Sequence, residues 1–367
     1  MKKKLLITVF ALTLAVTAYA QQYNSESDFQ IDWDKDASDG VVITRYTGTR
    51  TEVSIPPRIQ NNPVTAIGAG AFRDNRNITR VIIPNGVVRI NDGYNNNYSG
   101  KMIGRWQSDS ANAKGAFSNC TSLTSVTLPN SVTLIGNDAF SNCTSLTSIT
   151  IPNSVTYISG STFWGCTSLT SVTIPNSVTS IWEGAFYGCS KLANITIPNS
   201  VTIIGNYAFS RTGLTSITIP NSVTAIGSDA FTDCDSLTSV TLPNSITEIP
   251  ECLFEHCSKL AGITIPNSVT KIGNRAFLRT GLTSITIPNS VTSIEGGAFG
   301  DCNSLTSVTF EGTISSDNFA IRYSYLTLSQ NIRIPTFQGD LRDKYLASDG
   351  GPGTYRRFAN GQEWRKQ

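Results

Sequence analysis

Residues 146–168 read LTSITIPNSVTYISGSTFWGCTS, and this pattern recurs through most of the 367-residue chain. Each unit contains an Ile/Leu-Pro-Asn triplet, and from Pro129 onward the prolines of these triplets lie 22 or 23 residues apart. The full set is Pro84, Pro129, Pro152, Pro175, Pro198, Pro220, Pro243, Pro266 and Pro288. Self-similarity at a fixed period of this length is typical of solenoids, in which consecutive units stack on one another.

The apolar residues of each unit keep fixed places. In the quoted unit they are Leu146, Ile149, Ile151, Val155, Ile158, Phe163 and Cys166. The Leu-Thr-Ser-Ile-Thr-Ile segment predicts a short strand, because it is rich in β-branched residues and ends at a proline that cannot donate to a ladder. Val-x-x-Ile-Gly predicts a second extended or turning segment, and Ala-Phe predicts a short helical turn. One unit buries too few apolar side chains to fold alone, so we expect the units to stack in parallel.

The pattern Leu-x-x-Ile-x-Ile-Pro-x-x-Val-x-x-Ile-x-x-x-Ala-Phe-x-x-Cys resembles the bacterial leucine-rich repeats of the BspA or Treponema type, roughly over residues 40–346. The resemblance implies a β-rich α/β solenoid: a right-handed leucine-rich repeat superhelix with a parallel sheet and about ten repeats of 22–23 residues. It also implies a secreted or surface protein that acts in adhesion and recognition.

Residues 1–20 predict a secretory signal peptide. Three lysines precede an apolar run over residues 5–16, and the segment closes on Ala18-Tyr19-Ala20, the small-x-small pattern of a cleavage site. The run is shorter than the roughly 17–25 residues of a membrane-spanning helix. We therefore expect cleavage near Ala20 and a secreted, cell-surface or periplasmic protein, with no membrane insertion after cleavage.

The rest of the chain is predicted to have three parts. An N-terminal cap spans residues 21–51, the leucine-rich repeat solenoid spans 52–310, and a C-terminal cap and tail span 311–367. The gap of 45 residues between Pro84 and Pro129 equals one unit with an insertion, which we place at residues 92–114.

Composition argues against most enzymes and against nucleic-acid binders. The 28 Lys and Arg residues nearly balance the 26 Asp and Glu residues, so the positive field of a nucleic-acid-binding surface is missing. The sequence has one histidine and lacks the motifs of serine hydrolases, P-loop proteins and zinc proteases. We expect no cofactor and no metal, because Cys252, His256 and Cys257 lack the paired spacing of a metal site.

Seven of the eight cysteines occupy one position of the repeat. They are Cys120, Cys143, Cys166, Cys189, Cys234, Cys257 and Cys302. Secretion permits disulfides, but these residues recur in phase with the apolar positions, and an odd number cannot pair completely. We therefore expect buried free thiols that act as small core residues.

Candidate ligand-binding residues are the large aromatics of the turns and of the insertion. They are Tyr157, Trp164, Trp182, Tyr187 and Tyr207 in three consecutive units, and Tyr94, Tyr98 and Trp106 in the insertion. Stacking at about 4.8 Å per unit brings corresponding turns close together, so the first group is predicted to form an aromatic strip. The alternative is that these rings only cover the edge of the core. The insertion is either a binding loop or disordered.

The exposed positions of the strands carry Thr and Ser in almost every unit. These residues serve either as soluble strand formers or as weak, repeated contacts for sugars and matrix proteins. The sequence as a whole predicts an exported, non-enzymatic scaffold for adhesion or macromolecular recognition, with protein or carbohydrate ligands on host or neighbouring cells. Two alternatives stay open: a self-assembling structural surface component, and a glycan-active enzyme that uses a pair of carboxylates.

Overall fold

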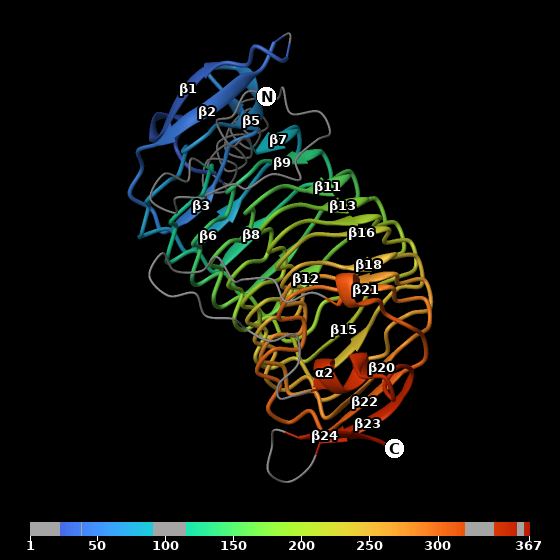
Figure 1. Ribbon diagram of the computed structural model, residues 1–367. Helices are drawn as coiled ribbons and strands as arrows, with labels where there is room; N and C mark the ends of the chain where they lie inside the picture. Colours follow the sequence, from blue (N-terminus) through green and yellow to red (C-terminus); the bar gives the residue numbers. More distant parts are fainter. Residues whose placement is uncertain (1–22, 38, 91–114, 320–340, 358–362) are drawn as a thin grey trace, which may run out of the picture.

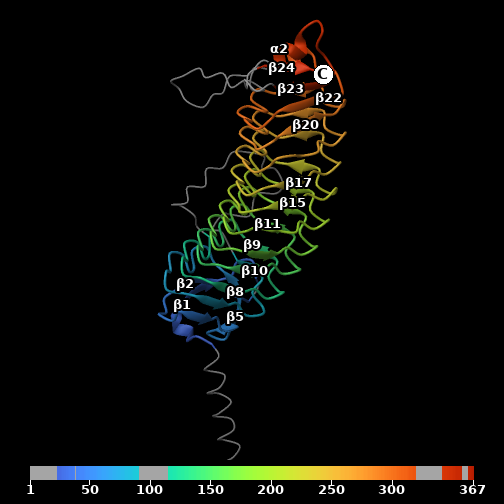
Figure 2. The ribbon, with the colours of Figure 1, turned by 90° about the horizontal axis from the view of Figure 1, so that it is seen from below.

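The computed structural model describes residues 23–37, 39–90, 115–319, 341–357 and 363–367. The repeats form a solenoid whose coils succeed one another from the N-terminal to the C-terminal end (Figures 1 and 2). Each coil has three sides, which we call the sheet side, the second side and the turn side. The apolar residues of the repeat point between these sides, and Leu146, Ile149 and Phe163 are all buried. The predicted leucine-rich repeat solenoid with parallel strands is confirmed.

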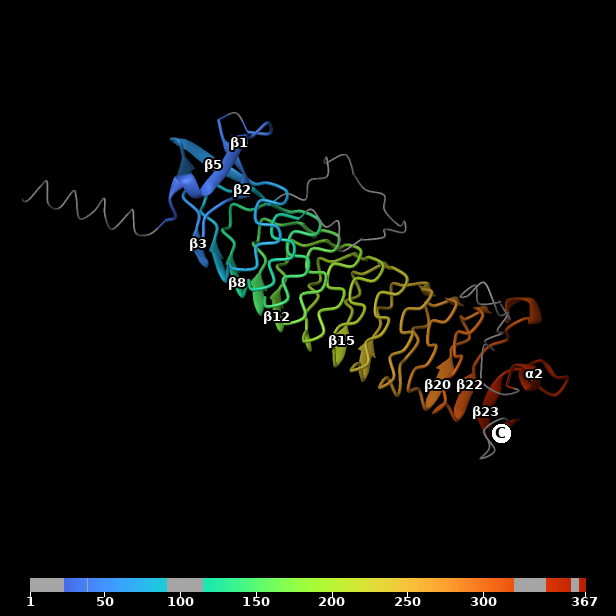
Figure 3. The same cartoon turned by 90° about the vertical axis from the view of Figure 1, so that its left-hand side faces the viewer.

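The sheet side contains the Thr- and Ser-rich strands, which follow one another along one edge of Figure 3. They are β3 (Glu52–Ser54), β6 (Arg80–Ile82), β8 (Ser125–Thr127), β10 (Ser148–Thr150), β12 (Ser171–Thr173), β15 (Ser216–Thr218), β17 (Ser239–Thr241), β20 (Ser284–Ile287) and β22 (Ser307–Phe310). Paired strands are parallel and in register, so that Ile149 lies opposite Val172. The sheet is divided into the groups β3-β6-β8, β10-β12, β15-β17 and β20-β22.

The second side is formed by the Val-x-x-Ile segments. Its strands are β5 (Asn62–Ile67), β7 (Arg89–Ile90), β9 (Leu134–Ile135), β11 (Tyr157–Ile158), β13 (Ser180–Ile181), β14 (Ile203–Ile204), β16 (Ala225–Ile226), β18 (Glu248–Ile249), β19 (Lys271–Ile272) and β21 (Ser293–Ile294). Neighbours pair in parallel, as β11 and β13 do. The predicted second extended segment is therefore a two-residue strand in most coils.

The turn side contains the Ala-Phe segments, and here the expected helical turn is wrong. Residues with left-handed backbone stand two positions before and two after the phenylalanine, as Asp138 (φ 54°) and Asn142 (φ 56°) do around Phe140. The backbone N–H of Phe140 donates to the carbonyl of Thr162 in the next coil at 2.9 Å. Two tight turns thus replace a helix: the N–H groups of Ser141 and Cys143 donate three residues back along the chain, whereas those of Phe140 and Asn142 donate to the next coil.

Phenylalanine rings form a continuous column behind these turns. Neighbouring ring centroids from Phe72 to Phe299 lie 4.7–5.7 Å apart. All rings of the column are almost fully buried. Each coil therefore contributes one large ring to a shared core. A single coil cannot fold alone, so it needs this packing against its neighbours.

The cysteines form a second column beside the rings. The thiol of Cys166 donates to the carbonyl oxygen of Phe140 at 3.1 Å, and the same bond recurs along the column. The seven cysteines of the column are free and buried, as expected, and Cys252 is also free and buried. Burial raises the pKa of Cys166 to about 12, so its thiol stays protonated at neutral pH.

Antiparallel strands pair with the stack near both ends. At the N-terminal end, η1 (Glu26–Asp28) leads into β1 (Phe29–Trp33), which pairs antiparallel with β2 (Val41–Tyr46). β4 (Arg58–Ile59) pairs antiparallel with β5. The elements of the C-terminal end are η2 (Ser316–Asn318), α2 (Leu341–Leu346), β23 (Gly353–Arg357) and β24 (Trp364–Lys366). β23 pairs antiparallel with β22, so neither β2 nor β22 presents a bare parallel edge.

Candidate functional site

Two of the predicted aromatic residues form a stacked pair on the turn side. Trp164 and Tyr187 each follow a phenylalanine of the column, in consecutive coils, and their ring centroids lie 3.7 Å apart with an interplanar angle of 13°. Both side chains are half-buried. The residues that follow them, Gly165 and Gly188, have φ values of 67° and 71°. Glycine takes this conformation without strain. We call Trp164 and Tyr187 the aromatic pair.

The other predicted aromatics are not part of this pair. Tyr157 lies on β11 of the second side, where it is 39% exposed. Trp182 directly follows β13, and Tyr207 lies in a turn with a φ of 54°; both are half-buried. The five residues are thus spread over more than one side, and the two rings that stack are Trp164 and Tyr187. Tyr94, Tyr98 and Trp106 lie outside the described residues.

A row of polar and charged residues continues from the aromatic pair along the turn side. The row consists of Arg211, Asp233, His256, Arg279 and Asp301, each two positions after a phenylalanine of the column and each with left-handed backbone. The guanidinium of Arg211 lies over the ring of Tyr187, 5.5 Å from its centroid, at a cation–π distance. We call these five residues the polar row.

Neighbouring members of the polar row contact one another from coil to coil. Arg211 Nε donates to Asp233 at 3.0 Å, and Arg279 Nε donates to Asp301 at 3.2 Å. Between these ion pairs, His256 Nδ1 lies 2.8 Å from Asp233 Oδ1, and its Nε2 lies 3.4 Å from Arg279 Nη1. A neutral imidazole with its proton on Nδ1 fits both contacts, because the guanidinium can only donate.

The ionisation of Asp233 follows from these contacts. Burial alone would raise its pKa, but hydrogen bonds from His256 and Arg211 outweigh burial and hold the pKa of Asp233 below its ordinary value. Asp233 is therefore a carboxylate at neutral pH, paired on both sides. Sequence reasoning missed the polar row because its acids look scattered among variable turns. Their shared place, two residues after each column phenylalanine, is the signal that identifies them.

A cavity of about 420 Å³ lies beside the first ion pair of the polar row. It is lined by Ser190, Arg211, Thr212, Gly213, Asp233, Asp235 and Ser236. The turn at residues 210–213 is one residue shorter than its counterparts, and the chain passes very close to the preceding coil. A Cβ atom on Gly213 would come within 2.2 Å of the carbonyl oxygen of Ser190, so only glycine fits there.

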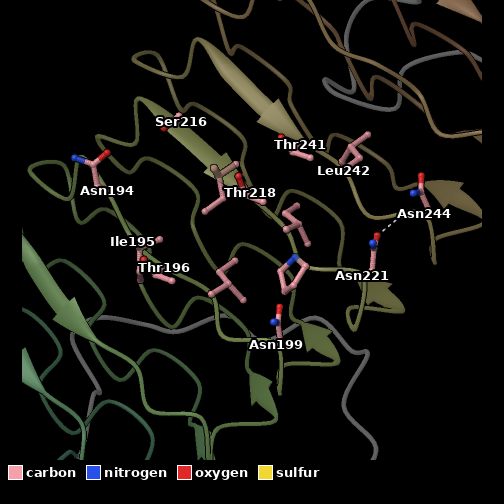
Figure 4. A pocket seen from close by; sticks show the side chains of 14 residues that line it. Asn194, Ile195, Thr196, Asn199, Ser216, Thr218, Asn221, Thr241, Leu242 and Asn244 are labelled. Carbon is pink, nitrogen blue, oxygen red and sulfur yellow. Dashed lines mark hydrogen bonds between the residues drawn. The ribbon is translucent and has the colours of Figure 1, made fainter.

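A wider groove of about 590 Å³ lies on the sheet side (Figure 4). Amides and hydroxyls from three coils line it, among them Asn194, Thr196, Thr218, Asn221 and Asn244. The backbone N–H of Asn244 donates to the side-chain oxygen of Asn221 at 2.8 Å. No charged or aromatic side chain lines this groove. The groove therefore offers hydrogen-bonding groups, but it lacks the aromatic or arginine side chains that dominate the binding energy of tight interfaces.

The structure separates Cys252, His256 and Cys257. Cys257 belongs to the cysteine column, where its thiol donates to Phe231, and His256 belongs to the polar row. Cys252 instead lies beside Asp229 and Glu255, and the potential ligand atoms of these three residues are all within 4.8 Å of one another. Burial raises the pKa of Asp229 to about 6, and the nearby carboxylates of Glu255 and Glu251 contribute to the rise.

Comparisons with known proteins agree with the repeat pattern. A family model described as BspA type Leucine rich repeat region matches residues 51–102, 112–238 and 224–337. None of the curated proteins matches the chain. In the part of the chain that the structure describes, no helix combines the length and the apolar character needed to cross a membrane.

Several solved structures are similar to the chain. A leucine rich cell surface protein from Faecalibacterium prausnitzii is 28% identical, and the match covers 81% of this chain and 96% of that chain with a TM-score of 0.39. A leucine-rich repeat protein from Bacteroides ovatus is 26% identical, with 77% and 87% covered and a TM-score of 0.40. The leucine rich repeat protein of T. pallidum is 25% identical, with 77% and 90% covered and a TM-score of 0.38.

Proposed function

The chain belongs to the BspA-type leucine-rich repeat family, and we propose that it is an exported, non-enzymatic scaffold for adhesion or macromolecular recognition. It acts at the bacterial cell surface or in the surrounding medium, after cleavage near Ala20. Its partners are protein or carbohydrate ligands on host or neighbouring cells. The signal-like pattern of residues 1–20 supports export.

The turn side carries this proposal. The aromatic pair and the polar row place two rings, two guanidinium groups, one imidazole and two carboxylates in consecutive coils of one surface. Aromatic and arginine side chains dominate the energetics of binding sites. The phenylalanine column behind the turns holds these side chains in fixed order, so the surface is organised before a ligand arrives, which lowers the entropy lost on binding.

The test is capture of surface components by the chain from residue 21 onward. Arrays of glycans and of host and bacterial surface proteins are probed with the unaltered chain and with a Trp164→Ala/Tyr187→Ala double variant. We expect the double variant to lose most of the capture. Trp33→Ala is the matched control, because it removes an exposed aromatic of β1 at the N-terminal end. Equal capture by the double variant and the control would remove the aromatic pair from the binding site.

The insertion is a second part of the proposed binding surface. Tyr94, Tyr98 and Trp106 are candidate contacts there, so a variant that lacks residues 92–114 is expected to bind more weakly while keeping its fold. Circular dichroism checks the fold, and the same arrays measure the binding. Unchanged affinity would restrict the site to the coils.

One observation favours a second candidate function, carboxylate-dependent glycan cleavage. Asp229 and Glu255 form a close carboxylate pair, and burial raises the pKa of Asp229 to about 6, as a general acid requires. The binding scaffold is preferred, because neither of the two cavities described above is lined by Asp229 or Glu255. Turnover on a glycan panel that Asp229→Asn abolishes would reverse this preference.

A further inference from the structure

The two shortest repeat units of the chain are near-copies of each other. Residues 192–213 read LANITIPNSVTIIGNYAFSRTG and residues 260–281 read LAGITIPNSVTKIGNRAFLRTG, each of 22 residues and each preceded by Ser-Lys. Their starting positions, 192 and 260, differ by 68 residues, which is three coils of 23, 23 and 22 residues. No other described coils have the Arg-Thr-Gly turn. The two copies of this unit therefore lie three coils apart.

The glycine and the aspartate partner of the Arg-Thr-Gly turn match in both copies, whereas the residue before each arginine in the row differs: Tyr187 for Arg211 and His256 for Arg279. A Cβ atom on Gly213 would lie 2.2 Å from the Ser190 carbonyl oxygen, and one on Gly281 would lie 2.3 Å from that of Ser258. The arginine of each turn pairs with an aspartate of the next coil, at 3.0 Å for Arg211 and at 3.2 Å for Arg279.

The threonine of each turn is also held in the same way. The hydroxyl of Thr212 lies 3.3 Å from the sulfur of Cys234, and that of Thr280 lies 3.2 Å from the sulfur of Cys302. Both threonines are buried. The residues that line the cavity of about 420 Å³ beside Arg211 correspond at the second turn to Ser258, Arg279, Thr280, Gly281, Asp301, Asn303 and Ser304, which match in residue type except for Asn303 in place of Asp235.

The chemistry of the two turns selects hydroxyl-rich ligands of low charge. Hydroxyl, guanidinium and carboxylate groups line the cavity beside Arg211, and no apolar side chain does. Each guanidinium is already neutralised by an aspartate, so a polyanion gains little there. A peptide would find no apolar anchor pocket. Vicinal sugar hydroxyls, in contrast, can both donate to the carboxylates and accept from the guanidinium groups.

The spacing of the two copies suits a polymer. Three coils at about 4.8 Å each separate them by about 14 Å along the solenoid. His256 bridges the interval by contacting both Asp233 and Arg279, so the polar row is continuous from one turn to the other. A linear chain that lies along the turn side meets the same chemistry twice, and linked sites of this kind gain affinity from effective concentration.

We propose that the Arg211 and Arg279 turns are two equivalent subsites that bind one linear, uncharged polysaccharide along the solenoid axis. This inference rests on the proposed recognition function and names the ligand class and its valency. A protein ligand for the same surface is the competing outcome of the test.

The experiment compares neutral polysaccharides (α- and β-glucans, mannan and xylan) with short oligosaccharides of the same linkage. Binding is measured by isothermal titration calorimetry on the chain from residue 21 onward, with the variants Arg211→Ala, Arg279→Ala and the double variant. For the polymer that binds, each single variant should lose at least about tenfold in affinity. For the short oligosaccharide, each single variant should lower the stoichiometry from two to one with unchanged affinity.

Arg80→Ala is the matched control, because Arg80 lies on β6 of the sheet side, far from both turns in sequence. Unchanged polymer binding by the double variant would overturn the inference, as would binding of peptides instead of polysaccharides or a single oligosaccharide site in the unaltered chain. If the surface arrays show capture that depends on Trp164 and Tyr187 but no polysaccharide binds, the inference fails and the recognition function stands. If nothing is captured, both fail.

Discussion

The turn side and the sheet side of the solenoid are built from the same repeats but differ in continuity. On the turn side, a backbone bond joins each coil to the next at the column phenylalanine, as from Phe163 to Ala185 at 2.9 Å. On the sheet side, residues 193–197 and 261–265 form no strand, although strands lie on both sides of each segment. Coils that are joined at the turn side thus form no strand at these two places on the sheet side, although the N–H of Thr215 still donates to the carbonyl of Ala193 at 3.0 Å.

Two of the interruptions coincide with a change of one side chain. On the sheet side a threonine hydroxyl donates to the carbonyl of the same position in the preceding coil, as from Thr170 to Thr147 at 3.0 Å and from Thr238 to Thr215 at 2.9 Å. Alanine occupies this position at 193 and 261, at two of the three interruptions; the third, between β8 and β10, has threonine at 124 and 147. We expect the missing hydroxyl to contribute to the first two, while the phenylalanine column continues through the same coils.

The largest expected effect on stability comes from a substitution in the phenylalanine column of the turn side. Phe163→Ala removes a fully buried ring from the middle of the column. The variant loses the hydrophobic burial of the ring and gains a cavity, so its free energy of unfolding should be lower by about 3–5 kcal/mol. Urea denaturation measures this free energy. Tyr157→Ala, in the same coil but on an exposed ring, is the control and should cost less than about 1 kcal/mol. Similar losses in the two variants would mean that the column does not carry the stability of the stack.

A smaller effect is expected at Asp229, where the turn side contains an unfavourable charge. Because the folded-state pKa of about 6 lies above the ordinary value of 3.8, folding binds protons between these two pH values. The free energy of unfolding should therefore fall as pH rises from about 4 to about 6. Asp229→Asn should remove this slope and add about 1–2 kcal/mol at neutral pH, a value reduced for partial exposure.

Thermal denaturation from pH 4 to pH 8 measures this dependence. Asp235→Asn is the control, since it removes an exposed carboxyl of the same coil. If the free energy of unfolding of Asp229→Asn depends on pH as that of the unaltered chain does, ionisation of the Asp229 carboxyl does not destabilise the fold.

The role of the threonine hydroxyl on the sheet side can be tested by restoring it where alanine replaces it. Ala193→Thr should let the new side chain donate to Thr170 and close the interruption beside β12, with a gain of about 0.5–1.5 kcal/mol. Hydrogen exchange of the amides at 172–174 and 194–196 should slow by a corresponding factor. Thr170→Ala is the reciprocal variant and should open the contact with Thr147. If Ala193→Thr leaves exchange unchanged, the interruption has another cause.

Sequence periodicity predicted the stacking, the strands and the buried cysteines, because these depend on apolar residues at fixed intervals. It did not predict the turn geometry, since the left-handed positions beside Ala-Phe are occupied by residues as different as Asp138, Ser161 and Arg275. It placed Trp164 and Tyr187 in adjacent turns, and the structure stacks them. The polar row escaped prediction because each contact joins residues 22 or 23 positions apart, and the charge alternates only when coils are aligned.

The smallest effect is expected at the cysteine column, where redox conditions should leave the stack unchanged. Burial raises the pKa of Cys166 to about 12 and that of Cys234 to about 11. At pH 8 only about one Cys166 thiol in ten thousand is then ionised, so alkylation must wait for unfolding. We expect no labelling by iodoacetamide in the native state, complete labelling in urea, and the same Tm with and without a reductant. Rapid native labelling, or a Tm that falls on reduction, would mean that neighbouring coils are linked through sulfur and that the turn side owes its continuity to more than its rings.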